Sequence, residues 1–155
     1  MDLQDILSPA AIRTSEKATS KKKLLQDLGQ HCAELYGLNT EQVYQALQDR
    51  ESLGPTAMGH GVAIPHARLA ALTEVRGFFV RLAKPIDFDS VDRQPVDLVF
   101  VLLAPENAGA AHLKALARVS RALRDASICA KLRAQDADAA LIYDILTGNE
   151  ASKAA

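Results

Sequence analysis

Residues 96–103 (VDLVFVLL) contain seven apolar side chains and one polar one, Asp97. A run this short and this rich in Val, Leu and Phe predicts a strand that is buried on both faces. A second run at 75–82 (VRGFFVRL) predicts another strand, and residues 62–64 a very short one that ends at Pro65. A sheet with such a central strand must be covered by other elements on both sides.

Helical periodicity lies on either side of these strands. A short helix is expected at 2–7, and longer ones at 21–36, between Ser20 and Gly37, and from Asn39 or Thr40 to about 51. Further helices are expected from Ala110 to about 124, at 127–133 and at 136–146. Residues 53–61, rich in Gly and Pro, predict a loop, and residues 84–95 a polar connection with a hairpin or edge element. The prediction is one α/β domain over 1–149, a mixed central sheet with helices on both faces, and a frayed tail at 150–155.

Composition excludes several classes of function. Lysine and arginine number 18 against 19 acidic residues, and aromatic residues make up 5% of the chain. These values give no net field and few rings to hold nucleic acid or an anionic membrane. The N-terminus lacks a secretory signal, and the longest strictly apolar run, 98–104, is far below the roughly 18 residues of a membrane span. Cys32 and Cys129 stand apart from any metal-binding spacing, so reduced core cysteines and a cytoplasmic location are expected.

The familiar ligand motifs are incomplete. Residues 59–64 begin like a dinucleotide-binding turn but carry Ile64 in place of the third glycine, and no phosphate-binding P-loop is present. Residues 87–92 (DFDSVD) lack the glycine and the final glutamate of a calcium loop. A zinc site, and with it a zinc-dependent hydrolase, remains open if the fold unites His60, His66 and His112. No cofactor or metal is otherwise expected.

His66 is the strongest candidate for chemistry. It follows Pro65, which fixes φ, at the point where the chain leaves a predicted strand. Ligand crevices form at strand ends in α/β sheets, and an imidazole titrates near neutrality. His66 is therefore a candidate base, metal ligand or nucleophile, with a surface histidine as the plain alternative. His31 lies within a predicted amphipathic helix and needs no functional role.

The segment 51–68 (ESLGPTAMGHGVAIPHAR) resembles the active-site signature of the enzyme IIA proteins of the fructose/mannitol superfamily of the phosphotransferase system (EIIA type 2). Glu51, Met58-Gly59 and the run 62–66 stand in the order and spacing of that signature. The stretches 85–105 and 112–123 are similar to the nitrogen-regulatory branch, enzyme IIA-Ntr. His60 departs from the polar residue, often Asn, that this branch has at its position. The resemblance extends from about residue 3 to 146 and implies the mannitol-IIA-like fold.

The resemblance also implies the roles of particular residues. His66 corresponds to the phosphorylated histidine, His112 to a second active-site histidine that stabilises the phosphoryl group, and Arg50 to an arginine that clamps the phosphate. Charge on the phosphoryl oxygens needs positioned donors. The remaining candidates for phosphate binding are the side chains of Thr56 and Arg68 and the loop amides around Gly59 and Gly61.

The resemblance implies that the protein is a nitrogen-regulatory phosphocarrier. It would take its phosphoryl group from a histidine phosphocarrier protein (HPr- or NPr-like), and its targets would include potassium transport or sensor-kinase proteins. A sugar-specific enzyme IIA that passes phosphate to a IIB domain is the alternative within the family. A binding module without catalytic function is an alternative of another class.

Overall fold

The computed structural model describes residues 2–149 and contains the expected mixed sheet. Its strands run in the order β1-β5-β6-β3-β2, and β4 also pairs with β6. β5 and β6 pair in antiparallel fashion, whereas β1 lies parallel to β5, and β3 and β4 lie parallel to β6. The strands are β1 (Ile12–Glu16), β2 (Ala57–Gly59), β3 (Val62–Ala63), β4 (His66–Leu69), β5 (Arg76–Ile86) and β6 (Val96–Pro105).

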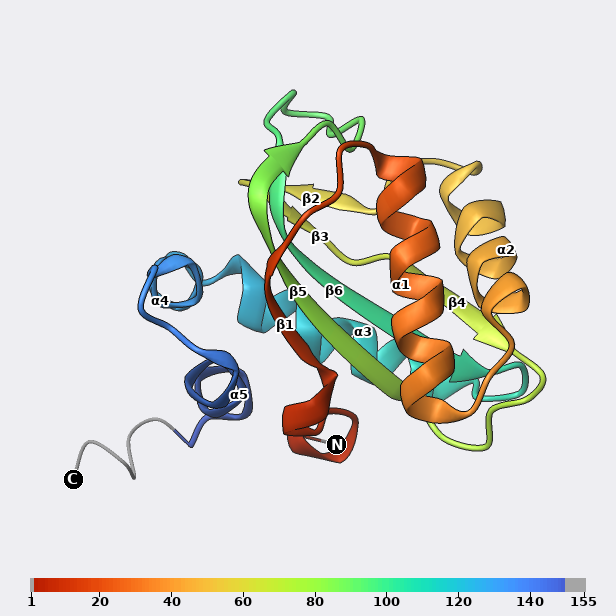
Figure 1. Cartoon of the computed structure of the whole chain (residues 1–155). Helices are drawn as coiled ribbons and strands as arrows, with labels where there is room; N and C mark the ends of the chain where they lie inside the picture. Colours follow the sequence, from red (N-terminus) through yellow and green to blue (C-terminus); the bar gives the residue numbers. More distant parts are fainter. Residues whose placement is uncertain (1, 150–155) are drawn as a thin grey trace.

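Helices cover both faces of this sheet, as the apolar character of β6 requires. α1 and α2 lie side by side in front of the sheet in Figure 1, α3 lies behind it, and α4 and α5 lie beyond β1. From residue 98 to 104 every side chain of β6 is at most 1% exposed. The helices are α1 (Lys21–Tyr36), α2 (Thr40–Glu51), α3 (Ala110–Arg124), α4 (Ala126–Arg133) and α5 (Ala139–Thr147), preceded by the 3₁₀ turns η1 (Leu3–Asp5) and η2 (Pro9–Ala11).

The helix boundaries agree with their capping residues. The Ser20 hydroxyl accepts a hydrogen bond from the Lys23 amide at the start of α1, and the Asn39 side chain accepts one from the Gln42 amide at the start of α2. Gly37 ends α1 in the left-handed conformation, with φ of 67°, which glycine adopts without a steric penalty. The predictions for α1 and α2 are confirmed, because these capping residues determine where both helices begin and where α1 ends.

Several short elements differ from the sequence expectation. The N-terminal helix expected at 2–7 is only the 3₁₀ turn η1. β2 falls inside the expected loop at 53–61, and β1 and β4 were not expected at all. α4 begins at Ala126, one residue before its expected start, and α5 begins at Ala139, three residues after its expected start. The predicted tail at 150–155 lies outside the described residues.

The elements around Pro65 position the candidate site. β3 and β4 are consecutive segments alongside the same strand: Val62 pairs with Leu98, and His66 with Leu102. The Pro65 carbonyl between them accepts a hydrogen bond from the Leu102 amide at 2.9 Å. His66 therefore follows the short strand β3, as expected, but it begins a further strand instead of leaving the sheet, and its backbone is fixed to β6.

Two further expectations concern the cysteines and the membrane. Cys32 and Cys129 are both buried and unpaired, as predicted. Among residues 2–149, no helix combines the length and the apolar character that crossing a bilayer requires.

Candidate functional site

His66 is half-buried, and its ring is oriented by its own backbone neighbourhood. Its Nδ1 lies 2.8 Å from the Ile64 carbonyl oxygen, which can only accept a hydrogen bond. The proton of the neutral ring therefore resides on Nδ1. Nε2 is left unprotonated, so it carries the lone pair that a nucleophile needs.

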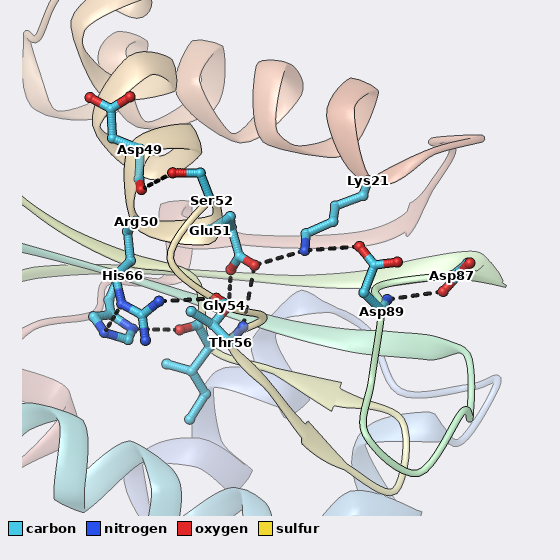
Figure 2. A network of polar contacts seen from close by, with 11 residues as sticks. Lys21, Asp49, Arg50, Glu51, Ser52, Gly54, Thr56, His66, Asp87 and Asp89 are labelled. Carbon is cyan, nitrogen blue, oxygen red and sulfur yellow. Dashed lines mark hydrogen bonds and ion pairs between the residues drawn. The ribbon is translucent and has the colours of Figure 1, made fainter.

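Arg50 confirms that assignment from the other side of the ring. Its Nε, which can only donate, lies 3.3 Å from His66 Nε2, and its Nη1 donates to the Gly54 carbonyl at 3.0 Å. In Figure 2 the guanidinium lies between the His66 ring and the loop that follows α2. The α2 helix thus brings Arg50 to His66, and a planar fork of donors stands at the nucleophilic nitrogen.

His112 lies in the first turn of α3 and is 7% exposed. Its ring is 5.7 Å from that of His66, centroid to centroid, and nearly perpendicular to it. Arg68 donates from Nε to His112 Nδ1 at 3.2 Å. The neutral His112 ring therefore carries its proton on Nε2, a buried atom with no hydrogen-bond partner among the described residues. A buried donor without a partner costs free energy unless a ligand satisfies it.

The electrostatics keep both rings neutral. The pKa of His66 is lowered from its ordinary value, first by burial and then by the Arg50 cation; the Ile64 carbonyl and the Glu51 carboxylate oppose this shift. Burial also lowers the pKa of His112, with further repulsion from His66 and Arg68. Near pH 7 the pair therefore presents one unprotonated ring nitrogen and one ring N–H group.

Thr56 and the two loop glycines have other surroundings. Thr56 is buried, and its backbone amide and hydroxyl both donate to the Glu51 carboxylate. Gly59 and Gly61 lie on the β2–β3 turn, beside the side chains of Asp92 and of Asp97 and Arg133, respectively. On β6, the residue that pairs with Val62 lies four positions before the residue that pairs with His66. This spacing separates the end of the β2–β3 turn from His66 by about 13 Å along the sheet. The fold therefore brings Arg50 and His112 to His66, and Arg68 to His112, but it does not bring these two glycines to the site.

The turn that holds the two glycines also carries His60 and borders a separate open cleft of about 860 Å³. His60 is exposed, its amide donates to Asp92, and its carbonyl accepts from Arg133. Neither His66 nor His112 lines that cleft. Across residues 2–149, no three His, Cys, Asp or Glu side chains are grouped so that they could hold a metal ion. The hydrolase alternative on His60, His66 and His112 thus lacks a ligand set there.

Some contacts of the site could not be derived from the sequence. The Ile64 carbonyl is a backbone atom two residues from His66, and no side-chain pattern signals it. Lys21 reaches the motif residue Glu51 from a different helix, with Nζ 2.8 Å from Oε2. The sequence signal at Lys21, a run of three lysines, is typical of an exposed helix start.

The phosphoenolpyruvate-dependent sugar phosphotransferase system EIIA 2 family matches residues 5–148. This chain belongs to that family. It is accordingly a phosphotransferase component, as the sequence predicted, and the resemblance found in residues 51–68 is confirmed over almost the whole described chain.

The relatives also bear out the predicted branch. A nitrogen regulatory protein of Bradyrhizobium diazoefficiens is 55% identical over 146 residues, 94% of this chain and 95% of that protein. One from Escherichia coli K12 is 38% identical over 97% of this chain and 92% of that protein. The fructose-specific EIIABC component of Bacillus subtilis is 31% identical over 97% of this chain, which spans only 24% of that larger protein.

Solved structures agree on the fold. The nitrogen regulatory protein IIA-Ntr of Neisseria meningitidis superposes with a TM-score of 0.88 at 36% identity, over 94% of this chain and 99% of that one. The mannitol IIA of Escherichia coli superposes with a TM-score of 0.76 at 24% identity, over 90% and 98%, a likeness in fold alone. The expected mannitol-IIA-like architecture is confirmed, and within it the nitrogen-regulatory IIA proteins are the more similar.

Proposed function

We propose that His66 accepts a phosphoryl group on Nε2 from the phosphohistidine of a histidine phosphocarrier protein (HPr- or NPr-like). The observation that carries this proposal is the tautomer of His66. With its proton held on Nδ1 by the Ile64 carbonyl, the ring presents its lone pair beside Arg50 and His112. A neutral imidazole is a good nucleophile near pH 7, and family membership supplies the phosphotransferase chemistry.

The transfer needs no nucleotide. The Nε2 lone pair of His66 forms the new N–P bond as the donor's N–P bond breaks, and the donor imidazole leaves with the electron pair. Arg50 turns its guanidinium from the ring nitrogen to the phosphoryl oxygens, and the unpartnered Nε2–H of His112 donates to a third oxygen. Both donors then stabilise charge that is spread over the phosphoryl group in the transition state.

The phosphorylated form would act as a switch on other proteins. A phosphoryl group adds about 1.5 to 2 negative charges near pH 7, at a surface formed by the end of α2 and the start of α3. The proposed targets are potassium transport or sensor-kinase proteins, in keeping with nitrogen-regulatory relatives, and the proposed location is the cytoplasm, where such a carrier would meet them. A target that contacts this surface would distinguish the two forms by charge.

Intact-mass measurement tests the proposal. The protein is incubated with phosphoenolpyruvate, enzyme I and the histidine phosphocarrier protein, and the mass should rise by one phosphoryl group that is lost in acid. His66→Ala should remain unlabelled. His60→Asn, a substitution that the left-handed backbone at His60 (φ of 55°) tolerates, should be labelled like the wild type. An unlabelled wild type would refute the proposal, as would a labelled His66→Ala.

A second experiment addresses the sugar-specific alternative. The phosphorylated protein is offered to a fructose- or mannitol-type IIB domain. Because the nitrogen-regulatory relatives match over almost their full length, we expect transfer to be slow or absent. Rapid transfer to IIB would assign the protein to sugar uptake instead of regulation.

A further inference from the structure

Glu51 is the first residue of the motif at 51–68. It is the last residue of α2, next to Arg50, and its side chain is only 2% exposed. A carboxylate this deeply buried is costly unless it is paired and hydrogen-bonded. Its partners therefore indicate what it holds in place.

The first partner is the loop that connects α2 to β2. Glu51 Oε2 accepts from the Thr56 amide at 3.2 Å, and Oε1 accepts from the Thr56 hydroxyl. Figure 2 shows these bonds joining the end of α2 to the far side of the loop. The Gly54 carbonyl, which anchors Arg50 Nη1, lies inside this closed segment. The direction of the Arg50 guanidinium thus depends on a loop conformation that Glu51 and Thr56 fix.

The second partner is Lys21, from the first turn of α1. Its Nζ lies 2.8 Å from Glu51 Oε2 and 3.4 Å from Asp89 Oδ2, and 4.6 Å from the centre of the Phe88 ring. The lysine compensates the charge of the buried carboxylate. Without it, the buried carboxylate would be left uncompensated, and water that entered to solvate it would weaken its hold on Thr56.

We propose that Lys21, Glu51 and Thr56 are positioning residues that hold Arg50 against Nε2 of His66. They do so by fixing the loop 52–56 that anchors the Arg50 guanidinium. None of the three makes a hydrogen bond to the His66 ring. Apart from the direct charge effects of Lys21 and Glu51, we expect them to act through Arg50. This inference rests on the role proposed for Arg50, but its main test does not depend on phosphoryl transfer.

The test measures the pKa of His66 by NMR titration in a double-mutant cycle. Arg50→Ala alone should raise this pKa, because the cation next to the ring is lost. Thr56→Val keeps charge and volume but removes the hydroxyl donor. We expect it to produce at least half of the Arg50→Ala rise in the wild-type background and no further rise in the Arg50→Ala background.

Three lysine variants extend the cycle. If Thr56→Val does not fold, they take its place. Lys21→Met should raise the His66 pKa in the wild-type background by more than in the Arg50→Ala background, where only its direct charge effect remains. Lys21→Arg should restore the wild-type value. Lys22→Met, at an exposed neighbour, should have no effect.

The outcomes are distinct. A His66 pKa unchanged by Thr56→Val and Lys21→Met, or raised equally in both backgrounds, would overturn the inference, as would a Lys22→Met effect equal to that of Lys21→Met. The rate of phosphoryl acceptance should show the same cycle, with about a tenfold loss for Thr56→Val that disappears in Arg50→Ala. If the wild type accepts no phosphate, the proposed function fails, while the titration still decides the positioning role.

Discussion

Arg68 Nε donates to His112 Nδ1 at 3.2 Å and thereby places the proton of the neutral His112 ring on Nε2. The two histidines of the site therefore have opposite tautomers. His66 is held as the Nδ1–H form by the Ile64 carbonyl, and His112 as the Nε2–H form by an arginine. The His66 ring is prepared to attack, and the His112 ring to donate a hydrogen bond. In each case a hydrogen bond at one ring nitrogen determines which of the two nitrogens carries the proton.

The first prediction concerns Arg68→Met. Without the Nε donor, His112 loses its preference for the Nε2–H tautomer, and the pKa of His112 rises because a neighbouring cation is gone. We expect phosphoryl acceptance by His66 to slow about tenfold, as for the weakening of one charge-stabilising donor. Nitrogen NMR of the His112 ring reports the tautomer directly.

A suitable control is Arg121→Met, at an exposed position of α3, the helix that carries His112. It should leave both the tautomer and the rate unchanged. If Arg68→Met leaves His112 in the Nε2–H form, the arginine does not set the tautomer.

The second prediction is the pH dependence of phosphoryl acceptance. Burial and Arg50 lower the pKa of His66 below its ordinary value of 6.5, so the ring is already unprotonated at neutral pH. As the pH falls from 8, the rate should therefore decline with a midpoint below 6.5. Single-turnover rates with a saturating phosphorylated donor provide the measurement.

Arg50→Ala isolates the contribution of His66 to this profile. Removing the cation should move the midpoint of the decline to higher pH, while any titration of the donor stays the same in both reactions. A wild-type midpoint at or above 6.5 would contradict the neutral-ring argument.

The accuracy of the sequence prediction followed the origin of each signal. α1 and α2 were predicted almost to the residue because Ser20, Gly37 and Asn39 act within one turn of the helix ends. β1 could not be predicted, because only the first of its five residues is buried and its extended form depends on pairing with β5. β4 is short and polar in part, and β6 supplies its pairing.

The site divides in the same way. The resemblance to the family already pointed to Arg50, His66 and His112, since it rests on residue types and their order along the sequence. The Ile64 carbonyl, the Arg68–His112 bond and the Lys21–Glu51 pair are contacts across the fold. The run of lysines at 21–23 has only the pattern of an exposed helix start, because a partner that lies on another element comes close only after folding.

The third prediction concerns the cysteines. Cys32 is fully buried, and desolvation raises the pKa of its thiol to about 12; burial also raises the pKa of Cys129. Since the thiolate is the reactive species, neither should react with an aromatic disulfide reagent within minutes at pH 8. Both should react after unfolding in guanidinium chloride. Rapid reaction of either thiol in the folded protein would contradict the burial of that site.

The fourth prediction concerns packing at the centre of the sheet. A Cβ atom at Gly77 would lie 2.8 Å from Cε1 and 3.1 Å from Cζ of Phe100, a ring that is completely buried. The new methyl group also has little room to shift, because the Ile6 carbonyl oxygen lies 3.4 Å from the same Cβ position. Gly77→Ala should therefore lower the free energy of unfolding by about 1–3 kcal/mol, the usual cost of overpacking a core.

The double variant with Phe100→Leu tests the physical cause. The smaller side chain makes room for the new methyl group, so the two substitutions together should cost less than the sum of their separate effects. Urea unfolding curves of the wild type, both single variants and the double variant give the four free energies. Additive losses would show that Gly77 is required for a reason other than its approach to Phe100, such as the hydrogen bonds that its backbone makes with Ile6 and Tyr36.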